Sequence, residues 1–172
     1  MHLYRKIIPK IARDVIRTLD AKKLVEIEEG KSDEAELDLA AVMVEYLNQE
    51  DRINREARET LSRRGLSQER FPQVRKSLAE LRGVKIGDEG MDNVLTQILE
   101  ALFASKNIAE IFADDLELRK LIKETMARYL SISEDIDKEA RARLKNIREG
   151  SPEWEIEYPR VVAQLKQNKG LA

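Results

Sequence analysis

Residues 46–61 of the chain read YLNQEDRINREARETL, and residues 129–144 read YLSISEDIDKEARARL. At a shift of 83 residues, 7 of these 16 positions are identical. The same shift pairs an apolar series near the start with another after residue 90: Ile11, Ala12, Val15, Ile16 and Leu19 with Val94, Leu95, Ile98, Leu99 and Leu102. Their spacing places each series on one face of a helix. The chain is therefore predicted to contain two copies of one helical unit.

The repeat also predicts how the chain is divided. Beyond a four-residue insertion the shift becomes 87 residues, and it pairs Phe71-Pro72, Val74, Leu78 and Gly83 with Tyr158-Pro159, Val161, Leu165 and Gly170. We expect a first helical repeat over residues 1–83, a glycine-containing linker over 84–90 and a second repeat over 91–172. No stretch alternates between apolar and polar residues with period two, so no sheet is expected and the fold class is predicted as all-α.

Capping residues predict where the helices begin and break. A first helix is expected over about residues 9–24, and Pro9 is tolerated in its first turn. Asp33 with Glu36, Asp114 with Glu117, and Ser151 with Pro152 have the spacing of helix starts. Asn48 and Ser131 occupy equivalent positions, where we expect a break or kink between the second and third helices.

The distribution of large apolar residues predicts which helices share a core. The first two helices of each copy contain most of them, so these four helices are expected to form a common base. The later pairs, about residues 49–82 and 132–168, combine a sparse apolar stripe with many charges. This pattern is typical of a two-helix arm packed along one seam, which we expect to pivot near Asn48 or Ser131.

Several segments give the chain a resemblance to a known family. These are Ile8-Pro9, Glu45-Tyr46-Leu47, Leu118-Arg119-Lys120 and, most distinctively, residues 149–158, which read EGSPEWEIEY. In these segments, and essentially end to end, the sequence resembles the bacterial domain-of-unknown-function 507 family. The resemblance implies a Y-shaped, internally duplicated helical protein, with an antiparallel four-helix base and two helical-hairpin arms related by a pseudo-twofold axis. It implies no activity, ligand or catalytic residue.

Composition excludes several classes of enzyme. The 172 residues include no cysteine and one histidine, His2, so a thiolate nucleophile, a Ser–His–Asp triad within a protomer and a sulfur-ligated metal are excluded. We therefore expect no enzyme activity, no metal and no cofactor. The 31 basic and 33 acidic residues nearly balance, and no apolar stretch approaches the length of a membrane span. A cytoplasmic protein without membrane contact is expected.

Basic residues form the first candidate site. Arg55 and Arg58 are equivalent to Lys138 and Arg141, and the second copy continues the stripe with Lys145 and Arg148. A spacing of i, i+3, i+7 and i+10 places the last four on one helical face, which could follow a phosphate backbone. The alternative is a solvated face with i, i+4 ion pairs such as Asp137–Arg141. No aromatic residues interleave with these charges to stack on bases, which favours the solvated face.

Acidic runs and the aromatic segment offer two further interpretations. Acidic residues gather in the first copy at Glu26, Glu28, Glu29, Asp33, Glu34 and Glu36, and in the second at Asp114 and Asp115. They could hold a cation or act as an acid–base pair, or they simply occupy a loop and a helix start. Trp154 would be a hot spot for a partner if exposed, and ordinary core if buried under the neighbouring helix, which burial statistics favour. We expect a non-catalytic protein-interaction module, an adaptor or scaffold. The alternative is a nucleic-acid-associated protein that uses the basic stripes.

Overall fold

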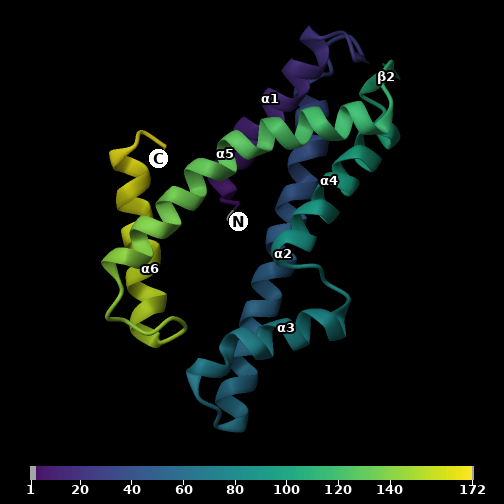
Figure 1. The fold of residues 1–172 in the computed structure, drawn as a ribbon. Helices are drawn as coiled ribbons and strands as arrows, with labels where there is room; N and C mark the ends of the chain where they lie inside the picture. Colours follow the sequence, from purple (N-terminus) through teal and green to yellow (C-terminus); the bar gives the residue numbers. More distant parts are fainter. Residues whose placement is uncertain (1–2, 172) are drawn as a thin grey trace.

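The computed structural model describes residues 3–171, so His2 lies outside the described residues. The chain is largely helical, and its elements run helix, strand, long helix and shorter helix twice in succession (Figure 1). In order they are α1 (Ile8–Ala21), β1 (Val25–Ile27), α2 (Ser32–Arg64), α3 (Phe71–Arg82), α4 (Gly87–Ala104), β2 (Ile108–Ile111), α5 (Asp115–Arg143) and α6 (Pro152–Asn168). Short 3-10 turns at Arg5–Ile7 and Gln68–Arg70 precede α1 and α3.

One large hydrophobic core joins α1, the first part of α2, α4 and the first part of α5. Its fully buried side chains include Ile11 and Ile16 of α1, Leu39 of α2, Ile98 of α4 and Ile122 of α5. The core continues along α2 to Leu47 and along α5 to Leu130. We call residues 3–47 and 87–130 the base, because they contain this core.

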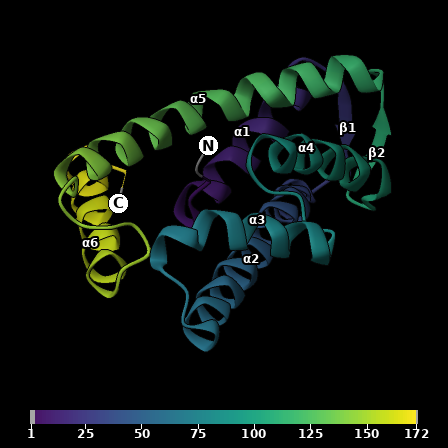
Figure 2. The same ribbon diagram turned by 60° about the horizontal axis from the view of Figure 1, so that its bottom comes forward.

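Two helical pairs continue from the base. In the first arm, residues 48–82, the second part of α2 contacts α3 and buries Ile53, Ala57 and Leu61. In the second arm, residues 131–171, the second part of α5 contacts α6 around a separate core of Ile136, Ala140, Val162 and Leu165. Figure 2 shows α5 running from the strands at one end of the molecule to α6 at the other.

The predicted breaks at Asn48 and Ser131 are wrong, because α2 and α5 pass through both positions without interruption. The buried face of α5 continues in helical register through Leu130, Ser133 and Ile136, so packing favours a straight path. The Asn48 side chain does not compete for its own backbone, since its Oδ1 accepts a hydrogen bond of 2.9 Å from the Arg5 guanidinium. Each long helix therefore belongs to both the base and an arm.

A small sheet corrects the prediction that the chain has no strands. β1 and β2 pair antiparallel, with Glu26 opposite Glu110 and an irregularity after Glu26. Strands of three and four residues are too short to show a period of two in the sequence, and they come from opposite halves of the chain. The sheet closes the end of the base that lies opposite the arms.

The predicted helix boundaries are partly confirmed. The Asp114 side chain accepts a 2.8 Å hydrogen bond from the Glu117 amide, and Ser151 accepts one of 3.2 Å from the Trp154 amide. The predicted start at Asp33 is wrong, since α2 begins at Ser32 without a side-chain cap. α4 begins at Gly87, so the last four residues of the segment 84–90 are helical.

Candidate functional site

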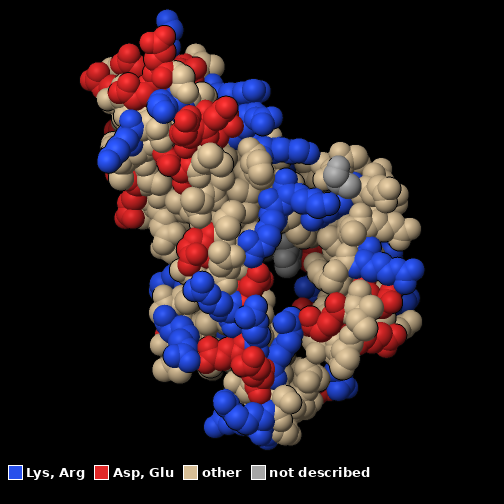
Figure 3. All heavy atoms as spheres, turned by 180° about the vertical axis from the view of Figure 1, so that it is seen from behind, with Lys and Arg blue, Asp and Glu red and all other residues tan. Residues whose placement is uncertain are grey.

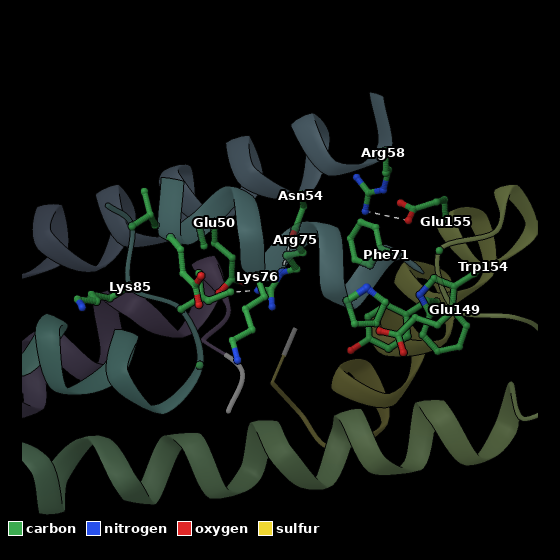
Figure 4. Close-up of a pocket in the computed structure, with 18 of the residues that line it drawn as sticks. Glu50, Asn54, Arg58, Phe71, Arg75, Lys76, Lys85, Glu149, Trp154 and Glu155 are labelled. Atoms are coloured by element: carbon green, nitrogen blue, oxygen red, sulfur yellow. Dashed lines mark hydrogen bonds and ion pairs between the residues drawn. The ribbon is translucent and has the colours of Figure 1, made fainter. Parts of the chain in front are cut away.

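A cleft lies between the two arms. Its volume is about 990 Å³, and its walls come from α2 and α3 of the first arm, from residues 83–89, and from α5 and α6 of the second arm with the turn between them. Figure 4 shows its lining, with Arg58 and Phe71 on one side and Trp154 and Glu149 on the other. Figure 3 shows an opening between the arms from behind, with lysine and arginine side chains along part of its edge.

Arg141 organises the second-arm wall of the cleft. Its Nε lies 2.9 Å from Asp137 Oδ2, and its Nη1 lies 2.7 Å from Glu149 Oε2. The guanidinium also lies over two rings, 5.4 Å from the centroid of Trp154 and 5.8 Å from that of Tyr158. Hydrogen bonds to Glu149 and Asp137 raise the pKa of Arg141 further above its ordinary value, against the effect of burial. This side chain is fixed by two carboxylates and two aromatic faces.

The aromatic rings beside Arg141 are packed rather than free. Trp154 is buried and stacks on Tyr158, with ring centroids 5.0 Å apart and planes 15° apart. The Tyr158 hydroxyl donates a hydrogen bond to Asp137 Oδ1. Burial, and then this bond, raise the pKa of Tyr158 above its usual range. Trp154 is thus part of the second arm's interior and presents only a small part of its surface to the cleft.

The first-arm wall repeats one part of this arrangement. Arg58 and Arg141 align at the sequence shift of 83 residues, and Phe71 and Tyr158 align at the shift of 87. Arg58 lies 5.7 Å from the centroid of the Phe71 ring. Arg58 has no carboxylate partner within its own arm among the described residues. It pairs across the cleft instead, with its Nη2 2.8 Å from Glu155 Oε1 of α6.

The tips of the two arms are joined by what we call the clasp, the ion pairs Arg58–Glu155 and Arg148–Glu69. In the second pair, Arg148 Nη2 lies 3.1 Å from Glu69 Oε1. All four side chains remain substantially exposed to solvent. Gly150 also approaches the first arm, since a Cβ built there would lie 3.5 Å from Gln68 Oε1 and 3.8 Å from the Phe71 ring.

Charges along the cleft largely neutralise one another. Its lining includes five basic and five acidic residues: Arg58, Arg75, Lys76, Lys85 and Arg141, and Glu50, Glu80, Glu89, Glu149 and Glu155. Arg75 pairs with Glu50 at 3.6 Å and Lys85 with Glu89 at 3.7 Å. Lys76 has no ion pair among residues 3–171, and Figure 4 shows it extending into the open space. Such a lining matches a partner of mixed charge better than a polyanion.

Residues 4 and 5 connect the base to both arms. Arg5 Nη2 lies 2.8 Å from Asp51 Oδ2 in the first arm. Lys166 Nζ of the second arm lies 3.6 Å from the centroid of the Tyr4 ring. Burial, and then the charge of Lys6, lower the pKa of Lys166. This segment holds each arm close to the point where it leaves the base.

The structure divides the predicted basic residues into two sets. Arg58, Arg141 and Arg148 belong to the ion pairs described above. Arg55, Lys138 and Lys145 are exposed, and none of the three has an ion pair within the described part of the chain. The stripe is therefore not one continuous free surface, because its central members are already neutralised.

Sequence reasoning missed several cleft residues, chiefly Phe71, Arg75, Glu149 and Glu155. Charged residues of this kind look like ordinary solvated helix positions when read singly. The only signal that could have found Phe71 is its equivalence to Tyr158, combined with the pairing of Arg58 and Arg141 in the repeat.

The described residues contain neither a cluster of metal ligands nor a helix suited to a bilayer. Across residues 3–171, no group of three or more histidine, cysteine or acidic side chains is arranged to hold a metal ion. Within the same residues, no helix combines the length and apolar character that crossing a bilayer requires.

Comparison with known proteins identifies the family. No curated protein matches the chain. The model of one family, described as "Protein of unknown function (DUF507)", matches residues 1–171 and so covers nearly the whole sequence. The chain belongs to the DUF507 family.

Proposed function

We propose that this protein is a non-catalytic protein-interaction module, an adaptor whose two arms close around a segment of a partner protein. The observation that carries the proposal is the cleft, whose walls come from both arms and whose tips are joined by exposed ion pairs and the approach of Gly150 to the first arm. Exposed ion pairs contribute about 0–1 kcal/mol each, so separating the tips costs little. A partner segment in the cleft would replace these contacts with its own.

Unsatisfied polar atoms at the clasp support a peptide as the occupant. Among the described residues, Arg58 Nε and Gln68 Oε1 are buried without a hydrogen-bond partner. The first is a donor and the second an acceptor, which a peptide carbonyl and a peptide N–H would satisfy. Leaving such atoms unpaired costs free energy, so a ligand that pairs with them gains affinity.

We also propose that the chain is an internal duplication of residues 1–83 and 91–172, joined by residues 84–90, and that it becomes Y-shaped when the clasp opens. Three observations support the duplication. The element order repeats, Arg58 and Arg141 each lie over an equivalent ring, and four equivalent pairs are buried alike: Leu47 and Leu130, Ile53 and Ile136, Ala57 and Ala140, Leu61 and Leu144.

The second candidate function is nucleic-acid association through Arg55, Lys138 and Lys145. It is favoured by the exposure of these three side chains and by their lack of ion pairs within residues 3–171. Electrostatic binding of this kind weakens steeply with added salt. Titration of labelled duplex DNA and RNA at two salt concentrations tests it, and submicromolar affinity with a steep salt dependence would favour it over the adaptor.

Cross-linking tests the adaptor proposal, because the natural chain has no cysteine. In the variant Glu69→Cys/Arg148→Cys, a short bis-maleimide joins the arm tips. The matched control is Glu26→Cys/Glu110→Cys, whose positions face each other in the sheet. Each variant is incubated with native cell extract, and proteins recovered with it are quantified by mass spectrometry.

The expected result depends on when the tips are joined. Cross-linking before incubation prevents partner recovery, and cross-linking afterwards retains the partner through stringent washing. Neither effect is expected in the control. Equal recovery with the tips joined beforehand would overturn the proposal that the cleft receives the partner.

A further inference from the structure

We propose a second interaction surface at the sheet end of the base, which binds a basic amphipathic segment of another protein through Phe103, Phe112 and Leu116. We call these three residues the sheet-end patch. They come from the end of α4, the end of β2 and the start of α5, which meet at the end of the molecule away from the arm tips (Figure 1).

The sheet-end patch is unusually exposed for residues of this type. The exposed fractions are 54% for Phe103, 60% for Phe112 and 77% for Leu116. A groove of about 440 Å³ runs beside it between α4 and α5. Leu99, Phe103 and Ala104 supply apolar lining to this groove, and Glu100 and Asp115 supply acidic lining. The one basic residue among the described residues of the lining, Arg119, donates a 2.6 Å hydrogen bond to Thr96 on the opposite helix. Exposed aromatic and leucine side chains beside a groove are typical of sites that anchor a partner's side chains.

The first half of the chain shows that the fold does not require these apolar side chains. At the shift of 83 residues, the positions of Phe103, Phe112 and Leu116 correspond to Asp20, Glu29 and Asp33. All three acidic residues are exposed at the matching ends of α1, β1 and α2. Because carboxylates occupy the same places in one half, the apolar residues of the other half serve a purpose other than folding.

Charge around the sheet-end patch selects the chemistry of the partner. Residues 100–120 contain five acidic residues, Glu100, Glu110, Asp114, Asp115 and Glu117, and three basic residues, Lys106, Arg119 and Lys120, which gives a net charge of −2. None of these eight side chains forms an ion pair within residues 3–171. Asp and Glu are dense over this end of the molecule in Figure 3. An apolar patch in such a field matches a segment that combines bulky apolar side chains with lysine or arginine.

The same charge disfavours two other occupants. A second copy of the chain bound through the same patch would bring two regions of net negative charge together. An anionic lipid surface would meet the same repulsion. A short basic amphipathic helix avoids both, and its apolar face fits a groove between two helices.

A synthetic peptide tests the proposal directly. The probe is a fluorescein-labelled 18-residue helix built from leucine on one face and lysine on the other. Two comparison peptides share its design: one has glutamate in place of lysine, and one has the same composition in scrambled order. Affinity for the full chain is measured by fluorescence anisotropy.

The test variant is Phe103→Asp/Phe112→Glu/Leu116→Asp, which places the residues of the first half into the second. These substitutions are compatible with folding, because the first half carries the same side chains at its matching positions, and circular dichroism checks it. The control variant is Leu81→Asp/Ile156→Asp, which changes two equally exposed apolar residues on the arms.

The lysine peptide is expected to bind the natural chain and the control variant alike, and to bind the test variant at least about tenfold more weakly. The glutamate and scrambled peptides are expected to bind at least about tenfold more weakly than the lysine peptide. Equal binding by the test variant, equal binding of the glutamate peptide, or no binding of the lysine peptide would overturn the proposal.

Two further outcomes would show that the sheet-end patch binds something other than a basic peptide segment. A dimer of the natural chain in light scattering that the test variant lacks would assign the patch to a second copy. Binding to lipid vesicles that only the test variant loses would assign it to a membrane. The cross-linked variant Glu69→Cys/Arg148→Cys tests this proposal independently of partner binding in the cleft. Joining the arm tips is expected to leave peptide binding at the sheet-end patch unchanged.

Discussion

Arg58 and Arg141 align at the sequence shift of 83 residues, but their side chains form ion pairs with different parts of the molecule. Arg141 holds two carboxylates and two rings within its own arm, whereas Arg58 reaches across the cleft to the other arm. The difference follows from their neighbours, because the residue equivalent to Asp137 is Asn54, which accepts a hydrogen bond from Arg75 instead. One arginine therefore stabilises an arm, and the other helps to join the two arms.

Substitution distinguishes these two tasks. Arg141→Ala removes an ion pair from the largely buried Asp137 and a cation from above Trp154, so the free energy of unfolding is expected to fall by about 2 kcal/mol. Arg58→Ala breaks only a partly exposed ion pair and should cost less than about 1 kcal/mol. Urea unfolding measures both. Equal losses in the two variants would contradict the assignment.

The raised pKa of Tyr158 determines how the free energy of unfolding changes at alkaline pH. Burial and its bond to Asp137 raise its pKa, so the folded state keeps the phenol proton more tightly than the unfolded chain does. The stabilisation is complete below the unfolded pKa of about 10 and is lost as pH rises through the folded pKa. Burial raises the pKa of Tyr46 as well, which adds to the same trend.

The comparison of natural chain and Tyr158→Phe isolates this contribution. The free energy of unfolding of the natural chain is expected to fall more steeply between about pH 9 and 11 than that of the variant, as measured by urea titration. Lys166 has a lowered pKa and acts in the opposite direction, but it is present in both proteins. Parallel pH profiles would show that the Tyr158 proton does not contribute.

Among the elements, helices with a full apolar stripe were predictable and contacts between distant segments were not. The faces of α1 and α4 followed directly from the spacing of residues such as Ile11 and Val94. The caps at Asp114 and Ser151 followed from local chemistry. The strands were missed because their pairing, Val25 with Ile111, joins residues far apart in the chain.

The continuity of α2 and α5 changes how an arm can move. Local signals at Asn48 and Ser131 predicted a break, but the tertiary packing of Leu130 and Ile136 on one helical face outweighs them. Movement of an arm then requires a long helix to bend, while Arg5 releases its contacts with Asn48 and Asp51. The predicted pivot is therefore a bend within a helix, because α2 and α5 each run without interruption from the base into an arm.

At the scale of the whole molecule, the candidate site depends on geometry that the sequence does not contain. The basic residues and Trp154 were recognisable from their spacing and chemistry. Their partners were not, because Arg58–Glu155 and Arg148–Glu69 form only when the two arms converge. An adaptor that grips one partner between its arms and docks another on its sheet end would connect the two across the length of the base.

Distances between spin labels on the two arms test whether the ion pairs hold the arms closed. Labels are placed at the exposed positions Ser62→Cys and Glu153→Cys near the two arm tips, and in the control at Arg17→Cys and Lys123→Cys in the base. Pulsed electron resonance then gives both distance distributions at low salt and at about 1 M salt, where charges are screened beyond about 3 Å.

At low salt, we expect a short and narrow distance distribution between the arm tips. At high salt, or with Arg148→Ala/Glu155→Ala at low salt, a population with longer distances is expected because the clasp is lost. The base distance should stay narrow under every condition. An arm-tip distribution that remains equally short and narrow at high salt and in the variant would contradict a clamp held closed by ion pairs.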